Sequence, residues 1–187
     1  MAPSRSNINR EATIASIEKA FLEDFRTKGI EGISVTSLCK KSEVSRSTFY
    51  LYFDDKYSVL QEVEDRLLKE FWEINKDLPD ITDEDRPNYH TQQVIDYILA
   101  NKDWYMALLG PYGDGLFVSR WRSIIKKSLR QKIEGRNRTE EDVEIQTNVF
   151  ASGLIGIFTY VLFENQNMDQ EVLGQYMTRL LGFSLRL

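Results

Sequence analysis

The apolar residues near the start of the chain recur at helical spacing. They lie three or four residues apart, which is typical of the buried face of an amphipathic helix. The positions are Ile14, Ile17, Ala20, Phe21 and Phe25. Asn9 is suited to cap the start of this helix, and Lys28 followed by Gly29 is a common helix end. The pattern therefore predicts a first helix over residues 9–28.

Two short helices follow in the pattern. Ser34 is a suitable N-cap for a helix over residues 35–41, and Ser45 for a second helix from Arg46 to Leu51 or Tyr52. Only the turn Ser42-Glu43-Val44 separates them. Two short helices joined in this way are typical of a helix-turn-helix, whose second helix fits the major groove of DNA.

The outward positions of this motif carry side chains that suit DNA. With Phe49 pointing inward, the other positions hold arginine, serine, threonine and tyrosine, which donate hydrogen bonds to phosphates or base edges. The predicted DNA-binding residues are Thr36, Ser45, Arg46, Ser47, Thr48, Tyr50, Tyr52 and Lys56. We expect Arg46, Ser47 and Thr48 to approach bases and the others to position the DNA backbone.

Lys56 lies in the first turn of the next predicted helix, for which Asp54 is the expected N-cap. A lysine at this end opposes the helix dipole, so a DNA phosphate would account for it. The alternative is that Lys56 simply pairs with Asp54 or Asp55. The sequence leaves both interpretations open.

The segment from Val44 to Lys56 resembles the DNA-binding signature of TetR-family transcriptional regulators, VS-x-x-TFY-x-YF-x-x-K. The chain departs from this pattern at two places. Ser42-Glu43 stands where the family usually has Ala-Gly, and Cys39 where it usually has Ala. Glu43 adds a negative charge near the expected DNA face. The resemblance implies a dimer that binds DNA and that is released by a small effector between the later helices, with repression as the default.

The remaining periodicity predicts only further helices. They span residues 55–76, 89–101, 102–109, 116–134, 139–163 and 169–185. An acidic loop, Asp77 to Asn88, follows the first of them. We therefore expect an all-α protein of about nine helices. Residues 1–55 would form a three-helix DNA-binding domain, and residues 56–187 a helical bundle for ligand binding and dimerisation.

The helix over residues 139–163 is apolar nearly all round, which indicates burial on both sides. The last helix can cover only one side, so we expect a second chain to cover the other and to form a four-helix bundle across a two-fold axis. The predicted dimer interface comprises Phe150, Leu154, Ile157, Phe158, Tyr176 and Leu180.

Aromatic residues gather in the middle helices and could line a ligand pocket, because tyrosine and tryptophan offer apolar area together with a polar group. The predicted pocket residues are Trp72, Trp104, Tyr105, Tyr112, Phe117 and Trp121. The alternative is that these rings form the core.

Residues 100–110 and 151–157 are also similar to a C-terminal domain of one TetR subgroup, which includes regulators resembling activators of dihydroxyacetone kinase genes.

Charge is distributed unevenly along the chain. The formal net charge is −5, but residues 1–60 carry about +1 and residues 61–187 about −6. A local basic cluster would therefore have to attract phosphate, and its members are Arg5, Arg10, Lys40, Lys41, Arg46 and Lys56. The basic side of the helix over residues 116–134 invites a nucleic-acid or membrane interpretation, with a solvated face beside acidic neighbours as the alternative.

Composition argues against an enzyme and against bound metal or cofactor. The chain has one cysteine and one histidine, Cys39 and His90, too few for a cysteine–histidine metal site. We expect Cys39 to be buried and His90 to lie on the surface. The longest apolar run, residues 150–163, is shorter than the roughly 20 residues of a membrane span, and the N-terminus lacks the apolar stretch of a signal peptide. The expected location is the cytoplasm.

Two functional hypotheses follow. The first is a homodimeric transcriptional regulator that binds a palindromic operator. The second is a protein of the same fold that works mainly through protein–protein contacts, as a co-activator. The acidic C-terminal part and Glu43 motivate the second hypothesis.

Overall fold

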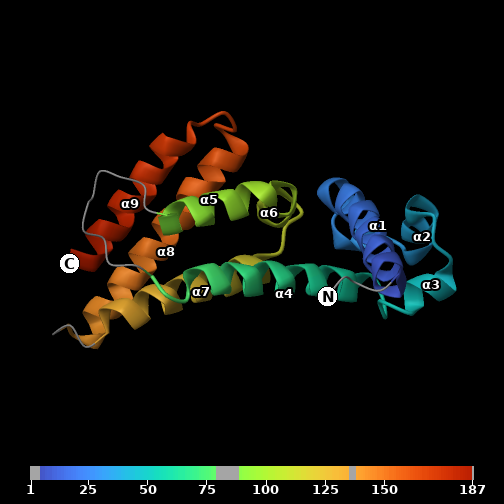
Figure 1. Ribbon diagram of the computed structural model, residues 1–187, viewed down its shortest axis with the longest axis horizontal. Coiled ribbons are helices and arrows are strands. Elements are labelled where there is room, and N and C mark those ends of the chain that lie inside the picture. Colours follow the sequence, from blue (N-terminus) through green and yellow to red (C-terminus); the bar gives the residue numbers. More distant parts are fainter. Residues whose placement is uncertain (1–4, 79–88, 135–137, 187) are drawn as a thin grey trace. The chain divides into compact units, whose positions relative to one another are not determined.

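The computed structural model describes residues 5–78, 89–134 and 138–186, and the side chains of residues 9–185 within these ranges (Figure 1). These residues form nine α-helices and one short 3-10 helix, without strands, so the all-α prediction is confirmed. The helices are α1 (Arg5–Lys28), η1 (Ile30–Gly32), α2 (Val35–Ser42), α3 (Arg46–Tyr50), α4 (Lys56–Asn75), α5 (Tyr89–Ala100), α6 (Lys102–Leu109), α7 (Gly115–Ile133), α8 (Glu140–Phe163) and α9 (Gln170–Arg186). Most of the predicted acidic loop, and the side chain of Arg5, lie outside the described residues.

The chain forms two compact units. One comprises the described residues up to Arg66 together with Ala107–Asp114, and the other comprises those of Leu67–Met106 and from Gly115 onward. The expected division after residue 55 stays a prediction.

Three helix starts have side-chain caps, and those at Ser34 and Ser45 were predicted. The Ser34 hydroxyl accepts a hydrogen bond from the Ser37 backbone N–H, and the Ser45 hydroxyl accepts one from the Thr48 N–H. Thr139 forms a capping box with Asp142 at the start of α8. Each cap satisfies a backbone donor that the helix itself leaves unpaired.

Two predicted caps are wrong. The helix α1 already begins at Arg5, so Asn9 lies within it; the segment after Pro3 contains no residue that would stop the helix from extending. At α4 the cap is Asp55 rather than Asp54. The Asp55 carboxylate accepts from the Ser58 N–H at 2.8 Å, while the Ser58 hydroxyl accepts from the Asp55 N–H at 3.2 Å. This reciprocal pair fixes the helix start one residue later.

The first unit has a core built mainly from α1 and the short helices. Helix α1 packs against α2, and α2 packs against α3. Phe21, Phe25, Leu38 and Phe49 are almost completely buried there. The predicted end of α1 is confirmed, because Gly29 has a φ of 65° and its N–H bonds the Phe25 carbonyl at 3.0 Å. A left-handed backbone of this kind favours glycine.

A buried carboxylate joins α1 to α2. The Asp24 side chain is 2% exposed, and it accepts hydrogen bonds from the Lys28 and Lys41 ammonium groups, each at 2.8 Å. The Ser37 hydroxyl donates to its other oxygen at 3.3 Å. Burial alone raises the pKa of Asp24, but the hydrogen bonds and charges of Lys28 and Lys41 outweigh it and leave the pKa below its ordinary value.

The second unit is organised around α8. This helix packs against α7 on one side and α9 on the other, and α5 also packs against α9. Phe150, Leu154 and Phe158 of α8 are buried in this bundle.

We predict that Asp24→Asn lowers the free energy of unfolding by about 2 kcal/mol at pH 7, because it leaves two lysines without their shared buried partner. The folded-state pKa of Asp24 is depressed. Its contribution is therefore present above the ordinary aspartate pKa of about 4 and is lost as the pH falls below it. Urea unfolding of both proteins between pH 7 and pH 3 measures this difference.

The matched control is Glu23→Gln, which removes an exposed carboxylate 3.8 Å from Lys41. It should change the stability little. A difference between the wild type and Asp24→Asn that persists unchanged into acid would contradict this account of Asp24.

Candidate functional site

The helix α3 presents most of its surface outward. Phe49 is its buried residue, whereas Arg46, Ser47 and Tyr50 are exposed. Helix α2 precedes it, with Glu43 as the C-cap of α2 and Ser45 as the N-cap of α3. The turn between the helices is thus as short as predicted, and the exposed side chains of α3 are free to enter a groove.

Hydroxyl groups at the start of α3 interact with one another. The Ser45 hydroxyl lies 2.8 Å from the Ser47 hydroxyl and 2.7 Å from the Thr48 hydroxyl. Thr48 is half-buried. Ser45 and Thr48 therefore stabilise the helix start, while Ser47 remains at the exposed edge of the cluster.

Arg46 is exposed and interacts with Tyr50 one turn further along α3. A hydrogen bond with the Tyr50 side chain raises the pKa of Arg46 above its ordinary value. The pair places a cation and an aromatic ring together on the outward surface. Thr36 is exposed in the first turn of α2, and Tyr52 is half-buried just after α3.

Lys56 has a partner that neither interpretation of the sequence named. Its ammonium group lies 3.4 Å from the Glu31 carbonyl oxygen and 3.7 Å from the Glu31 carboxylate, and its side chain is only 17% exposed. The Tyr57 hydroxyl donates to the same carboxylate at 3.1 Å. Glu31 is 25 residues earlier in the chain, so local spacing could not reveal it. A phosphate would have to compete with Glu31 for Lys56.

The predicted basic cluster is partly neutralised within the protein. Lys41 is bound to Asp24, and Lys56 to Glu31. Lys40 and Arg46 are exposed and form no ion pair with the part of the chain that the structure describes. The strongest uncompensated positive charge of α2 and α3 therefore comes from these two residues.

Glu43 occupies the left-handed conformation expected where the family has glycine. Its φ and ψ are 56° and 32°, which makes it the only non-glycine residue with positive φ among the described residues. Left-handed backbone costs a residue with a Cβ about 1–2 kcal/mol. The turn is thus formed with strain, and the exposed carboxylate adds a negative charge beside α3.

Three of the predicted pocket residues belong to the core. Tyr105, Phe117 and Trp121 are completely buried, and their ring centroids lie 5.0–6.3 Å apart. Phe71 and Phe158 extend this cluster, because the ring of each also contacts Trp121. For these three rings the structure favours the core alternative.

The other three predicted pocket residues lie elsewhere. Trp72 is half-buried beneath the ammonium group of Lys127, which is 4.2 Å from the ring centroid. Trp104 is half-buried on α6. Tyr112 is exposed and packs at Gly29 in the first compact unit. The six residues therefore do not converge on one pocket in this structure.

The predicted dimer-interface residues divide into two groups. Phe150, Leu154 and Phe158 are buried by the chain's own helices, whereas Ile157 and Leu180 are half-buried and Tyr176 is 54% exposed. The helical period places the exposed face of α8 beside the predicted positions rather than on them. The exposed residues of this face are Ile145, Val149, Ser152, Gly156, Tyr160 and Phe163.

Exposed apolar residues also occur on α9. They are Val172, Tyr176 and Phe183.

Among the described residues, α8 is the one helix long and apolar enough to cross a membrane by length and composition, with 44% of its apolar window buried. A single helix of this kind is weak evidence for a membrane span, because core helices of soluble proteins have the same properties.

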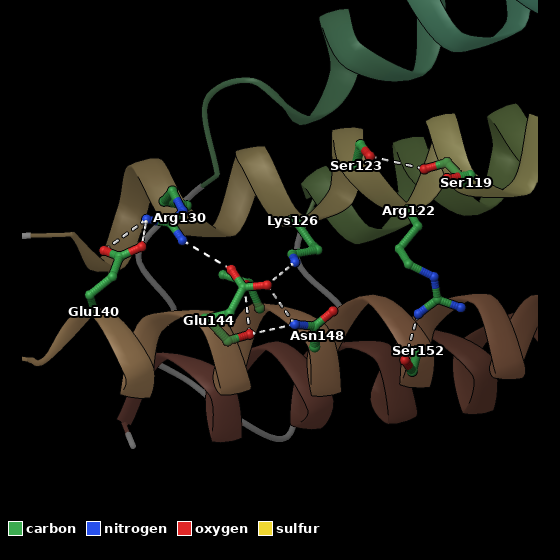
Figure 2. Close-up of polar contacts among 10 residues, drawn as sticks. Ser119, Arg122, Ser123, Lys126, Arg130, Glu140, Glu144, Asn148 and Ser152 are labelled. Carbon is green, nitrogen blue, oxygen red and sulfur yellow. Dashed lines mark hydrogen bonds and ion pairs between the residues drawn. The ribbon is translucent and has the colours of Figure 1, made fainter.

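The basic face of α7 pairs with acidic residues of α8, as Figure 2 shows. Arg130 donates to Glu140 at 2.8 Å and to Glu144 at 3.1 Å, and Lys126 also bonds Glu144. Arg122 donates to the Ser152 hydroxyl at 2.6 Å. These contacts agree with the alternative in which acidic neighbours offset the positive charge of this face of α7.

His90 differs from the expected surface residue. Its side chain is half-buried, but both ring nitrogens are inaccessible and make no regular hydrogen bond in the described part of the chain. Burial lowers the pKa of His90, and the nearby Ile74 carbonyl offsets this only in part. The position of His90 in sequence, beside an exposed tyrosine, gave no signal of this environment. Cys39 is buried, as expected.

Two family models match the chain. Residues 19–63 match the model for bacterial regulatory proteins of the tetR family, and residues 85–182 match a model for a transcriptional regulator C-terminal region. An uncharacterised helix-turn-helix transcriptional regulator of Bacillus subtilis, YxbF, is 32% identical over 53 residues. That match spans 28% of this chain and only 14% of the relative's length.

Solved structures share the fold. The dihydroxyacetone kinase operon activator DhaS is 18% identical with a TM-score of 0.61, over 93% of this chain and 96% of that one. A TetR transcriptional regulator from Streptococcus agalactiae is 22% identical with a TM-score of 0.61, over 95% of this chain and 99% of that one. The similarity thus covers both compact units.

We predict that Glu43→Gly raises the free energy of unfolding by about 0.5–1 kcal/mol, because relief of left-handed strain exceeds the entropic cost of glycine. Glu43→Asn should stabilise less, since asparagine tolerates this conformation only in part. Glu43→Gln is the control that removes the charge and keeps the strain, so its stability should match the wild type. Thermal unfolding measures the stability of all three variants. A Glu43→Gly protein less stable than the wild type would contradict the claim that Glu43 is strained.

Proposed function

The chain belongs to the TetR family of bacterial regulatory proteins, and on that basis we propose that it binds a palindromic DNA operator as a homodimer, represses transcription, and is released by a small-molecule effector. Regulation of transcription follows from the family. Repression, the effector and the dimer are the proposed parts.

One observation carries the DNA-binding role. Helix α3 buries Phe49 and turns Arg46, Ser47 and Tyr50 outward, and Lys40 of α2 is exposed as well. Arginine can bond the two acceptors of a guanine edge in the major groove, and the hydroxyl groups suit phosphates or bases. We therefore assign base contacts to Arg46 and Ser47, and backbone contacts to Thr36, Tyr50, Tyr52 and Lys56.

The exposed face of α8 and α9 supports the dimer. Large apolar side chains on a surface mark an interaction site, and this face carries Val149, Tyr160 and Tyr176 at 46–54% exposure. A hollow beside Gly156, Tyr160 and Tyr176 offers about 410 Å³ for a partner's side chains. Two copies related by a two-fold axis would bring two α3 helices to DNA half-sites roughly 34–36 Å apart.

Two glycines of α8 have different surroundings. A Cβ at Gly153 would lie 3.0 Å from Leu180 of α9, so Gly153 allows the two helices of one chain to pack closely. A Cβ at Gly156 would meet nothing within 4 Å. We assign Gly156 to the close approach of a second chain.

A second function is favoured by a separate observation. Lys41 and Lys56 are neutralised within the chain, and Glu43 adds a negative charge beside α3. A protein with these features could act through protein–protein contacts as a co-activator, and bind DNA well only with its partner.

In either case the proposed location is the cytoplasm, where bacterial DNA is found.

We predict that Arg46→Ala relaxes sequence preference and costs about 1–3 kcal/mol at the base pair it contacts. Lys56→Ala should weaken binding to all sequences alike and reduce the salt dependence. Gel-shift titrations on the promoter beside the gene, and on unrelated DNA, measure both effects. If neither substitution changes DNA binding, these roles are wrong.

We predict that Glu31→Gln strengthens DNA binding several-fold without regard to sequence, because it frees Lys56 from its competing carboxylate and still accepts from Tyr57. The gain should shrink as salt rises. Glu62→Gln is the matched control. Glu62 is exposed on α4 and forms no ion pair with a lysine in the described part of the chain. Equal effects of both variants would show that only net charge matters.

We predict that Gly156→Arg yields a folded monomer, because the added side chain projects into open space in one chain and blocks the approach of another. Gly153→Ala should instead leave the dimer intact, since its methyl group meets Leu180 of the same chain. Light scattering and thermal unfolding distinguish the two. A Gly156→Arg protein that remains dimeric would remove this face from the interface.

A further inference from the structure

A small, partly open cavity lies in the second compact unit. It is lined by residues at the end of α4, the start of α5, and the facing sides of α8 and α9. The apolar lining residues are Leu78, Val94, Phe150, Leu154, Met177 and Leu181. The polar ones are Asn75, His90 and Thr91. Its volume is about 20 Å³, which is enough for one water molecule.

The polar groups that line the cavity differ in their hydrogen bonding. The Asn75 side-chain amide donates to the Phe71 carbonyl at 2.8 Å, and the Thr91 hydroxyl lies 3.4 Å from that of Thr178. Both nitrogens of His90, in contrast, are buried and have no regular hydrogen-bond partner in the described ranges. Unmade hydrogen bonds at buried atoms destabilise a fold, so an imidazole in this position indicates a role other than stability.

The charge of the cavity limits what it can bind. Burial lowers the pKa of His90, so the ring is neutral at neutral pH and offers one donor and one acceptor. No lysine, arginine, aspartate or glutamate is among its described lining residues. An ionised group would therefore lack a counter-charge, whereas an uncharged group that both donates and accepts would satisfy the imidazole.

We propose that this cavity is a ligand site, and that it takes a compact, mainly apolar molecule bearing one uncharged hydroxyl-type group, which bonds His90. The proposal rests on the proposed function in one respect, namely that this molecule would be the effector. The hydroxyl group of the ligand occupies the water-sized space beside the imidazole. The apolar part lies against the leucine, valine and phenylalanine side chains.

A ligand larger than water requires part of the wall to move. Met177 is the most adaptable wall residue, because its unbranched side chain has three rotatable bonds. Leu78 follows the end of α4, outside regular helix. Rearrangement of these two side chains would enlarge the cavity without breaking a described hydrogen bond. The same helix α4 carries Lys56 in its first turn and Asn75 at its last residue, which offers a route from the ligand to the DNA-binding residues.

The test uses the full-length protein and the fact that His90 is its only histidine, so that the imidazole signals in a long-range proton–nitrogen NMR spectrum need no assignment. Phenol is the probe. It should shift these signals and raise the unfolding temperature, with a dissociation constant of about 1 mM for a ligand of this size. Toluene, which lacks the hydroxyl, should bind more weakly, and benzoate, which is charged, should leave the signals unchanged.

The variants separate binding from structure. His90→Phe should be at least as stable as the wild type, because it removes two buried nitrogens that lack a regular hydrogen bond. Phenol should no longer raise its unfolding temperature. His90→Gln should keep part of the phenol response. Tyr89→Phe is the neighbouring control on an exposed side chain, with the full response expected.

Two results would overturn the proposal. One is an imidazole spectrum that none of the three probes changes, which would mean that the cavity holds water only. The other is a His90→Phe protein that is clearly less stable and still responds to phenol. DNA binding is measured separately, without any probe. A failure of the proposed function would appear in that measurement and would not change the response to the probes.

Discussion

The burial of Phe49 is the constraint on which the DNA-binding surface depends. Helix α3 has only five residues, far fewer than an isolated helix needs for stability in water. Its position is therefore imposed by the cap at Ser45 and by Phe49, whose ring lies 5.7 Å from that of Phe53 and 5.5 Å from that of Tyr50. Because one face of α3 is fixed in this way, Arg46 and Ser47 must point outward.

Electrostatics around this surface is a balance rather than a simple basic patch. Asp24 uses Lys41 to hold α2 against α1, and Glu31 holds Lys56. The first contact is buried and structural. The second is at the surface, where salt and competing phosphates weaken it. We therefore expect DNA affinity to depend on a few free cations, on the exchange of Lys56 between Glu31 and phosphate, and on the opposing charge of Glu43.

The sequence was most informative where a signal was local. Serine caps at residues 34 and 45, the glycine end of α1 and the helix-turn-helix could all be predicted, because each depends on residues within a few positions. Contacts between distant segments could not. Glu31 beside Lys56 and the buried ring of His90 arise from the tertiary fold. Periodicity also indicated that α8 is apolar all round, yet it could not decide that Phe150 faces inward and Val149 outward, since neighbouring positions on such a helix have similar side chains.

Selection of bound sequences from random double-stranded DNA tests most directly whether paired α3 helices read DNA. We expect enrichment of a palindrome whose half-sites are about one helical turn apart, at 10–10.5 base pairs or slightly more. Arg46→Ala should lose this enrichment at one position of each half-site. Recovery of no common sequence by the purified protein, even at low salt, would contradict the claim and favour action through a protein partner.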